Sequence, residues 1–102
     1  MTDSSDNKPE LHIHYCSQCN WLMRSAWLAQ EVLNTFSEQL ASVSLHPVTG
    51  GRFEITLEGK VLWERKRDQG FPDAAELKRR VRDVLDPGRD LGHLDSPGNV
   101  PS

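Results

Sequence analysis

The sequence has no long hydrophobic run and no strong excess of charge of either sign. A membrane-spanning helix needs about 20 consecutive apolar residues, and no stretch of this chain approaches that length. The formal net charge is −3, so no strong field attracts the protein to nucleic acid or to an acidic membrane surface. We therefore expect neither nucleic acid nor a membrane among its partners.

Cysteine is scarce, and the first ten residues do not resemble a secretory signal. They are polar and acidic, without a basic region followed by an apolar stretch, so we expect a cytoplasmic protein. The chain has 2 cysteines, Cys16 and Cys19, and both lie in one short motif. In a reducing compartment such a pair more often carries redox chemistry or binds a metal than forms a structural disulfide.

The 102 residues are enough for one domain with a thin core. Residues 1–9 show no apolar periodicity, and we predict a disordered leader there. Residues 87–102 are rich in proline and glycine, which predicts a flexible tail. The folded domain should therefore span residues 10–86.

Hydrophobic periodicity predicts strands and helices in the order β-α-β-β-β-α. Alternation predicts strands at residues 11–15 and 43–46, the second ended by Pro47, and a hairpin of residues 53–58 and 61–65 around Gly59-Lys60. A 3.6-residue period predicts a helix over residues 21–40, with a buried stripe of Leu22, Ala26, Ala29, Leu33, Phe36 and Leu40.

A second helix is predicted after Asp73, which with Glu76 resembles a capping box. Its apolar stripe comprises Leu77, Val81, Val84 and Leu85, and Pro87-Gly88 ends it. The sequence does not otherwise repeat.

The predicted strands separate apolar from polar side chains cleanly. One side holds Leu11, Ile13, Tyr15, Val43, Leu45, Phe53, Ile55 and Leu57, and the other holds His12, His14, Ser44, His46, Glu54, Thr56 and Glu58. A strand-helix-strand unit requires a right-handed parallel crossover. We therefore expect an α/β fold with a four-stranded mixed sheet and two helices on one face. The other face would be open to water, to a partner, or to a second copy in a homo-oligomer.

The motif Cys16-Ser17-Gln18-Cys19 lies between the first predicted strand and the long predicted helix. Unpaired N–H groups and the dipole at a helix start favour a thiolate, which lowers a thiol pKa below its usual value of about 8.5. A thiolate attacks a disulfide, and a second nearby thiol resolves the mixed disulfide. We predict a redox dithiol with Cys16 and Cys19 as catalytic residues, and Cys16 as the attacking thiol.

The same cysteines also admit a metal-binding interpretation. Zinc needs four ligands, and a second Cys-x-x-Cys is absent, so His14 or a second subunit would have to complete a zinc or iron–sulfur site. His12, His14 and His46 are expected to be solvated strand residues. A third hypothesis is an interaction domain that binds a partner through the open sheet face.

Several residues near the motif are candidates for supporting roles. Ser17 and Gln18 separate the cysteines, and Trp21 is expected to pack at the rim, where it could shelter the thiols or contact a partner. Arg24 is expected to be solvated, with stabilisation of a thiolate as the alternative. The basic run Arg65-Lys66-Arg67 is interpreted as a solvated strand end, because Glu64 and Asp68 offset its charge.

Four segments together resemble a known family. YCSQC at residues 15–19, GGRFEI at 50–55, GKVLW at 59–63 and GFP at 70–72 occur in this order. Over residues 10–86 the chain resembles the bacterial branch of the selenoprotein W-like (Rdx) family. The resemblance implies a thioredoxin-like fold of the β-α-β-β-β-α form. It also implies a thiol oxidoreductase or regulator in cell redox homeostasis, with protein or glutathione disulfides as partners and no bound cofactor.

The resemblance also bears on individual residues. Animal members carry selenocysteine at the position of Cys19, which suggests that the second cysteine attacks, whereas the helix-start argument favours Cys16. A thiol is a slower nucleophile than a selenol, so peroxide reduction does not carry over. Thioredoxin-like proteins often place a cis proline opposite the active cysteines, and Pro47 is the candidate for that position in either isomer.

Overall fold

The fold comprises one sheet and two long helices, in a computed structural model that describes residues 8–92. The expected element order is confirmed, with a short extra helix after the last strand. No helix within residues 8–92 is long and apolar enough to cross a membrane. The elements are β1 (Glu10–Cys16), the 3-10 turn η2 (Ser17–Cys19), α1 (Leu22–Phe36), β2 (Ser42–Val48), β3 (Phe53–Leu57), β4 (Lys60–Glu64), α2 (Arg65–Asp68) and α3 (Ala74–Leu85).

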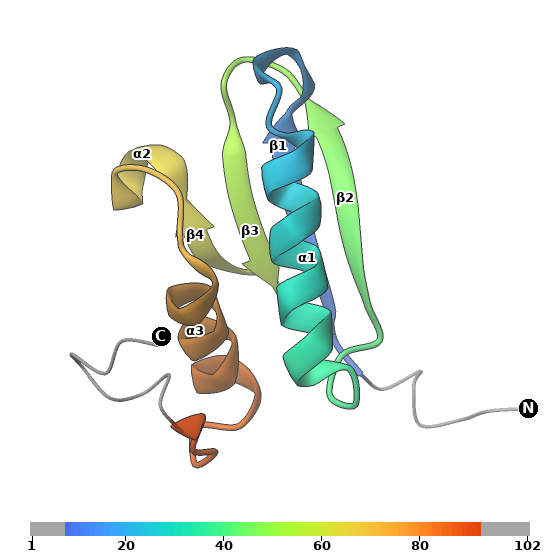
Figure 1. Ribbon diagram of the computed structural model, residues 1–102, viewed down its shortest axis with the longest axis vertical. Coiled ribbons are helices and arrows are strands. Elements are labelled where there is room, and N and C mark those ends of the chain that lie inside the picture. The colour runs from blue at the N-terminus through green and yellow to red at the C-terminus, as the bar shows by residue number, and fades with distance from the viewer. Residues whose placement is uncertain (1–7, 93–102) are drawn as a thin grey trace, which may run out of the picture.

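The sheet is mixed, as predicted, with strand order β2-β1-β3-β4. β1 pairs parallel with β2 and antiparallel with β3, and β4 pairs antiparallel with β3. Figure 1 shows α1 lying in front of β1, with α3 beside it on the side of β4. The parallel β1–β2 pair is the unit that requires the crossover through α1.

A single hydrophobic core lies between the sheet and the two long helices. Both helices contribute to the same buried cluster, which confirms that they cover one face of the sheet. Alternation along β1 and β3 places every second residue in this core, whereas Val43 and Leu45 of β2 are only partly buried. The strand residues of the core are Leu11, Ile13, Tyr15, Phe53, Ile55, Leu57, Leu62 and Trp63, and the helix residues are Leu28, Ala29, Val32, Phe36, Leu77 and Val81.

The predicted buried stripe of the first helix was partly wrong, since Ala29, Phe36 and Leu40 are buried but the side that packs on the sheet is shifted. Leu22 and Leu33 are exposed, and the buried residues of α1 are Ser25, Leu28, Ala29, Val32 and Phe36. Both sides of this helix carry apolar residues, so periodicity alone could not choose the side that packs on the sheet. Ser25 tolerates burial because its hydroxyl donates to the Trp21 carbonyl at 2.8 Å. The helix also ends at Phe36, earlier than predicted.

Two strand boundaries also differ from the prediction. Pro47 does not end β2, which continues to Val48. A proline is tolerated there because β2 is an edge strand. The hairpin turn is formed by Glu58 and Gly59, both with positive φ, and Lys60 already belongs to β4. Positive φ at both central positions matches the twist of paired strands.

The basic run after β4 is helical, whereas a strand end was predicted. Arg65 begins α2, and the Glu64 side chain caps this helix by accepting from the Arg67 N–H at 2.8 Å. The Asp68 carboxylate in turn accepts from the Glu64 backbone N–H at 2.9 Å. These reciprocal bonds satisfy donors that a helix start leaves unpaired.

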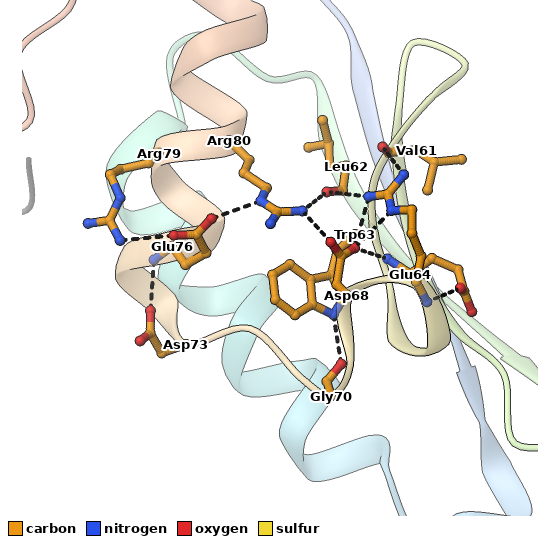
Figure 2. Close-up of polar contacts among 11 residues, drawn as sticks. Val61, Leu62, Trp63, Glu64, Asp68, Gly70, Asp73, Glu76, Arg79 and Arg80 are labelled. Carbon is orange, nitrogen blue, oxygen red and sulfur yellow. Dashed lines mark hydrogen bonds and ion pairs between the residues drawn. The ribbon is translucent and has the colours of Figure 1, made fainter.

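A network of charged side chains joins α3 to β4 and α2 (Figure 2). The Arg80 guanidinium donates to the Leu62 carbonyl at 2.7 Å, to Asp68 at 3.3 Å and to Glu76 at 2.9 Å. The predicted Asp73 cap is confirmed, since its carboxylate accepts from the Glu76 N–H at 2.7 Å, but the Glu76 carboxylate binds Arg79 and Arg80 and does not complete a capping box. Arg80 therefore connects three elements that the sheet alone does not hold together.

Trp63 completes this arrangement on its apolar side. Its indole N–H donates to the Gly70 carbonyl at 2.8 Å, and the Arg80 guanidinium lies 4.4 Å from its ring centroid. Figure 2 shows the indole next to Arg80 and Asp68. A cation over an aromatic face is attracted by the ring quadrupole, so Trp63 contributes both packing and charge stabilisation.

The network lowers the pKa values of two carboxyl groups. Hydrogen bonds from Arg80 and Arg79 lower the pKa of Glu76 below its ordinary value of 4.5. Burial alone would raise the pKa of Asp68, but hydrogen bonds from Glu64, Arg67 and Arg80 outweigh it and lower the pKa below 3.8. A folded-state pKa below the unfolded one adds stability above the unfolded pKa, and this is lost as pH falls through the folded value.

We therefore expect the free energy of unfolding to decrease as pH falls from 5 to 3, and to decrease less in Glu76→Gln than in the wild type. The measurement is urea unfolding at each pH, followed by circular dichroism. Asp83→Asn is the matched control, because Asp83 lies on the same helix and is 63 % exposed. An equal pH dependence in wild type and Glu76→Gln would contradict the role of Glu76.

Candidate redox site

Cys16 and Cys19 are paired as a disulfide at the carboxyl end of β1. Their Cα atoms are 5.4 Å apart, within the range that disulfides usually span. Cys16 is the last residue of β1, and the three-residue turn η2 brings Cys19 back towards it. Asn20 then adopts a left-handed conformation, which asparagine tolerates better than most residues, and α1 follows. Strand, turn and helix thus bring the two predicted catalytic residues together.

The two cysteines differ in exposure. Cys16 is 1 % exposed, whereas Cys19 is partly exposed. The expectation that Cys16 stands at the start of the long helix does not match the geometry, because η2 separates it from α1. Cys19 is the cysteine closer to Leu22, where α1 begins. Cys19 is therefore both the more exposed cysteine and the one closer to the start of α1.

The predicted supporting residues Ser17, Gln18 and Pro47 lie beside the motif. The Ser17 hydroxyl donates to the Val48 carbonyl at 3.3 Å, which ties η2 to β2. Pro47 pairs with Tyr15 in the β1–β2 register, one position before Cys16. No peptide bond in residues 8–92 is cis, so the His46–Pro47 bond is trans. Gln18 is exposed between the cysteines.

Trp21 and Arg24 belong to an aromatic cluster behind the start of α1. The rings of Trp21 and Phe53 each form a T-shaped pair with the Phe71 ring. The centroid distance is 4.9 Å in both pairs. The Arg24 guanidinium lies 4.3 Å from the Phe71 centroid, and that of Arg65 lies 5.2 Å from the Trp21 centroid. Arg24 is thus held against an aromatic ring, and the basic run after β4 contributes a second cation to the same cluster.

Exposed apolar side chains begin α1 directly after the motif. Leu22, Met23 and Trp27 are 48 %, 81 % and 45 % exposed. Met23 and Trp27 are four residues apart and so lie on the same side of the helix. The sequence analysis missed this surface because it placed Leu22 in the core. The number of apolar residues in α1 could have indicated this surface, because α1 has more apolar residues than one buried side of a helix can accommodate.

A three-ligand metal site is not formed in the described part of the chain. Within residues 8–92, no group of three or more His, Cys, Asp or Glu side chains is placed to hold a metal ion. The hypothetical combination of Cys16, Cys19 and His14 is therefore not assembled. The two sulfur atoms are bonded to each other instead.

The histidines of β1 and β2 are in contact, although solvated positions were expected for them. His12 Nδ1 lies 2.9 Å from His46 Nε2, and the His14 and His46 rings stack at 4.6 Å. Burial lowers the pKa of His14, and the neighbouring imidazole of His46 lowers it further, with Arg52 adding to the effect and Glu54 opposing it. The contact arises because the parallel register sets His14 opposite His46.

Comparison with known proteins supports the features described above. The family model described as "Rdx family" matches residues 10–83. A search of curated proteins found no match. Among solved structures, a selenoprotein W-related protein from Vibrio cholerae is 60 % identical with a TM-score of 0.76. The alignment covers 78 % of this chain and 100 % of that one.

A second crystal structure, of a protein from Bordetella parapertussis, is 54 % identical with a TM-score of 0.75. The alignment covers 76 % of this chain and 99 % of that one. The family match includes the Cys16–Cys19 segment and all four strands, and the fold is the thioredoxin-like fold of the selenoprotein W-like proteins. The family match spans most of the chain, and this protein therefore belongs to the Rdx family.

Proposed function

We propose that this protein is a thiol–disulfide redox protein in which Cys16 and Cys19 cycle between a disulfide and a dithiol. The observation that carries the proposal is the pairing of the two cysteines at the strand–helix junction of an Rdx-family domain. A disulfide that closes so short a loop removes less chain entropy than one that closes a long loop, so structural disulfides gain more from wider spacing. A redox role explains the pair better.

In the proposed cycle Cys19 attacks and Cys16 resolves, which reverses the roles expected from the sequence. The Cys19 thiolate attacks one sulfur of a partner disulfide, whose S–S bond breaks and releases the first partner thiolate. The Cys16 thiolate then attacks the Cys19 sulfur, forms the intramolecular disulfide and releases the second partner thiolate. Two electrons pass from the dithiol to the partner, and the two released thiolates take up protons from water.

Burial supports this assignment of roles. Cys19 is partly exposed to solvent, whereas Cys16 is almost fully enclosed. An enclosed thiol is a poor first nucleophile towards a bulky disulfide but can attack a sulfur that is already next to it. Cys19 also occupies the position at which related proteins of the family carry selenium, a stronger nucleophile.

The surroundings of Cys19 indicate the kind of partner. Met23 and Trp27 present exposed apolar area on the helix that follows the motif, which suits a disulfide in an apolar peptide environment. The aromatic cluster that includes Trp21, two residues after Cys19, carries the positive charges of Arg24 and Arg65, which suits an anionic thiol such as glutathione. Protein and glutathione disulfides are thus the proposed substrates, and a part in cytoplasmic redox homeostasis is the proposed cellular role.

We expect Cys19 of the reduced protein to react with iodoacetamide at least about tenfold faster than Cys16, because a nearly buried thiol is shielded from the reagent. Mass spectrometry of the two labelled positions over time gives both rates. The same labelling in urea is the control, where the two rates should become similar. Equal rates in the folded protein, or faster labelling of Cys16, would refute the proposed order of attack.

We also expect Cys16→Ser to accumulate a mixed disulfide with oxidised glutathione, since the attacking thiol is present and the resolving thiol is absent. Cys19→Ser should accumulate much less, and a variant with both substitutions should accumulate none. Intact-mass spectrometry after quenching with acid measures each adduct. If no variant forms an adduct and dithiothreitol does not reduce the wild-type disulfide, the redox function is wrong.

A further inference from the structure

The sheet face opposite the helices carries a cluster of imidazoles that the redox chemistry does not use. Leu11, Ile13 and Tyr15 of β1 enter the core under α1 and α3, so the alternate residues His12 and His14 project from the other side. That side is turned away from the viewer in Figure 1. His46 of the neighbouring strand joins them through the parallel register. The His12 side chain keeps 33 % of its surface exposed, so small solutes can reach it.

We propose that His12 and His46 form a two-histidine site for a divalent transition-metal ion on this open face. The two nitrogens that face each other, His12 Nδ1 and His46 Nε2, are 2.9 Å apart. Two imidazole nitrogens bound to one metal at about 2.05 Å are separated by about 2.9 Å at a 90° angle and about 3.3 Å at a tetrahedral angle. The ring centroids are 5.0 Å apart and the rings are tilted by 45°, so they are not stacked. The two nitrogens are hydrogen-bonded to each other, and the ion replaces their shared hydrogen as each ring rotates to direct its nitrogen at the ion.

Glu10 supplies the outer contact that metal-binding histidines usually have. Its Oε1 lies 3.7 Å from His12 Nε2, the nitrogen on the far side of the ring from His46. The distance is longer than a hydrogen bond, but a carboxylate on that side of the ring favours a proton on Nε2, which leaves the lone pair of Nδ1 for the metal. When the ion enters, the hydrogen between His12 and His46 moves to the outer nitrogen of its own ring, so both ligands stay neutral.

His14 is the matched neighbour that does not belong to the site. Its ring stacks on His46 with an interplanar angle of 17°, so the two rings lie face to face and do not converge. Its Nδ1 is enclosed and has no hydrogen-bond partner. His14 thus packs against the back of the His46 ring and fixes its orientation.

The ligand set determines which ions fit. Imidazole suits Zn²⁺, Ni²⁺ and Cu²⁺, and a 90° bite is typical of the octahedral and tetragonal geometries of Ni²⁺ and Cu²⁺. Since residues 8–92 offer no third protein ligand here, water must complete the coordination. Protons compete for the same nitrogens, so binding should weaken as the pH is lowered.

Ni²⁺ titration by calorimetry tests the site in a protein with Cys16→Ser, Cys19→Ser and His93→Ala. This background removes both thiols and the remaining histidine, so the result is independent of the redox proposal. We expect one equivalent of Ni²⁺ to bind at pH 7.5. His12→Ala and His46→Ala should each weaken binding at least about tenfold, and Glu10→Gln about tenfold. His14→Asn is the control and should change the affinity by less than about threefold.

The proposal is overturned if the background protein binds no Ni²⁺, if binding survives both His12→Ala and His46→Ala, or if His14→Asn abolishes it. Paramagnetic broadening of NMR signals by substoichiometric Ni²⁺ provides a second test in the background protein, whose sheet histidines are intact. Broadening centred on His12 and His46 supports the site even where a variant unfolds. Broadening centred elsewhere in the chain refutes it.

Discussion

The burial of alternate residues of β1 is the constraint on which the rest of the structure depends. β1 lies inside the sheet, paired on both sides, and Leu11 and Ile13 have no exposed surface. A slip of one residue in its register would turn these side chains to solvent and bring histidines into the core. The cost of such a change, about 2 kcal/mol or more for each large apolar side chain, fixes the register. The proposed redox site and the proposed metal site both depend on that register.

The first of these regions is the end of the strand, where Cys16 meets the turn that carries Cys19. β2 supports the turn through the Ser17–Val48 hydrogen bond, and α1 begins immediately afterwards. The second region is the histidine face, which exists because β1 and β2 run parallel and place His14 opposite His46. One short strand thus positions a sulfur pair at its end and imidazoles along its side. The two chemistries use different atoms and do not compete for ligands.

Much of this arrangement could be predicted from local patterns. The alternation of residues 11–15 and 53–58 has one interpretation, and the Asp73 cap acts within four residues, so the two strands and this cap were confirmed. The buried side of α1 was not predictable in this way, since Leu22 and Leu33 are as apolar as the residues that pack. The choice depends on the crossover from β1 to β2, which is a property of the whole domain.

Features that depend on contacts between distant segments were also missed. The helix α2 forms where a strand end was expected, because Glu64 and Asp68 cap it and Arg80 holds it from α3. The exposure of Cys19 relative to Cys16 follows from the turn η2, whose conformation the motif letters do not specify. The contact of His12 with His46 required the register of two strands separated by a helix. The sequence placed each of these residues in a strand, turn or helix, but it did not predict which other residues their side chains contact.

The charged side chains around β4 have a consequence for self-association. An edge strand of a sheet normally has unpaired N–H and carbonyl groups that can pair with another polypeptide chain, and this pairing can start aggregation. Here the Arg67 guanidinium donates to the Leu62 carbonyl at 3.2 Å, and Arg80 donates to the same oxygen. At the opposite border, Pro47 in β2 has no N–H to donate. Each border of the sheet is thus partly blocked, which disfavours its growth into a fibril by addition of further strands.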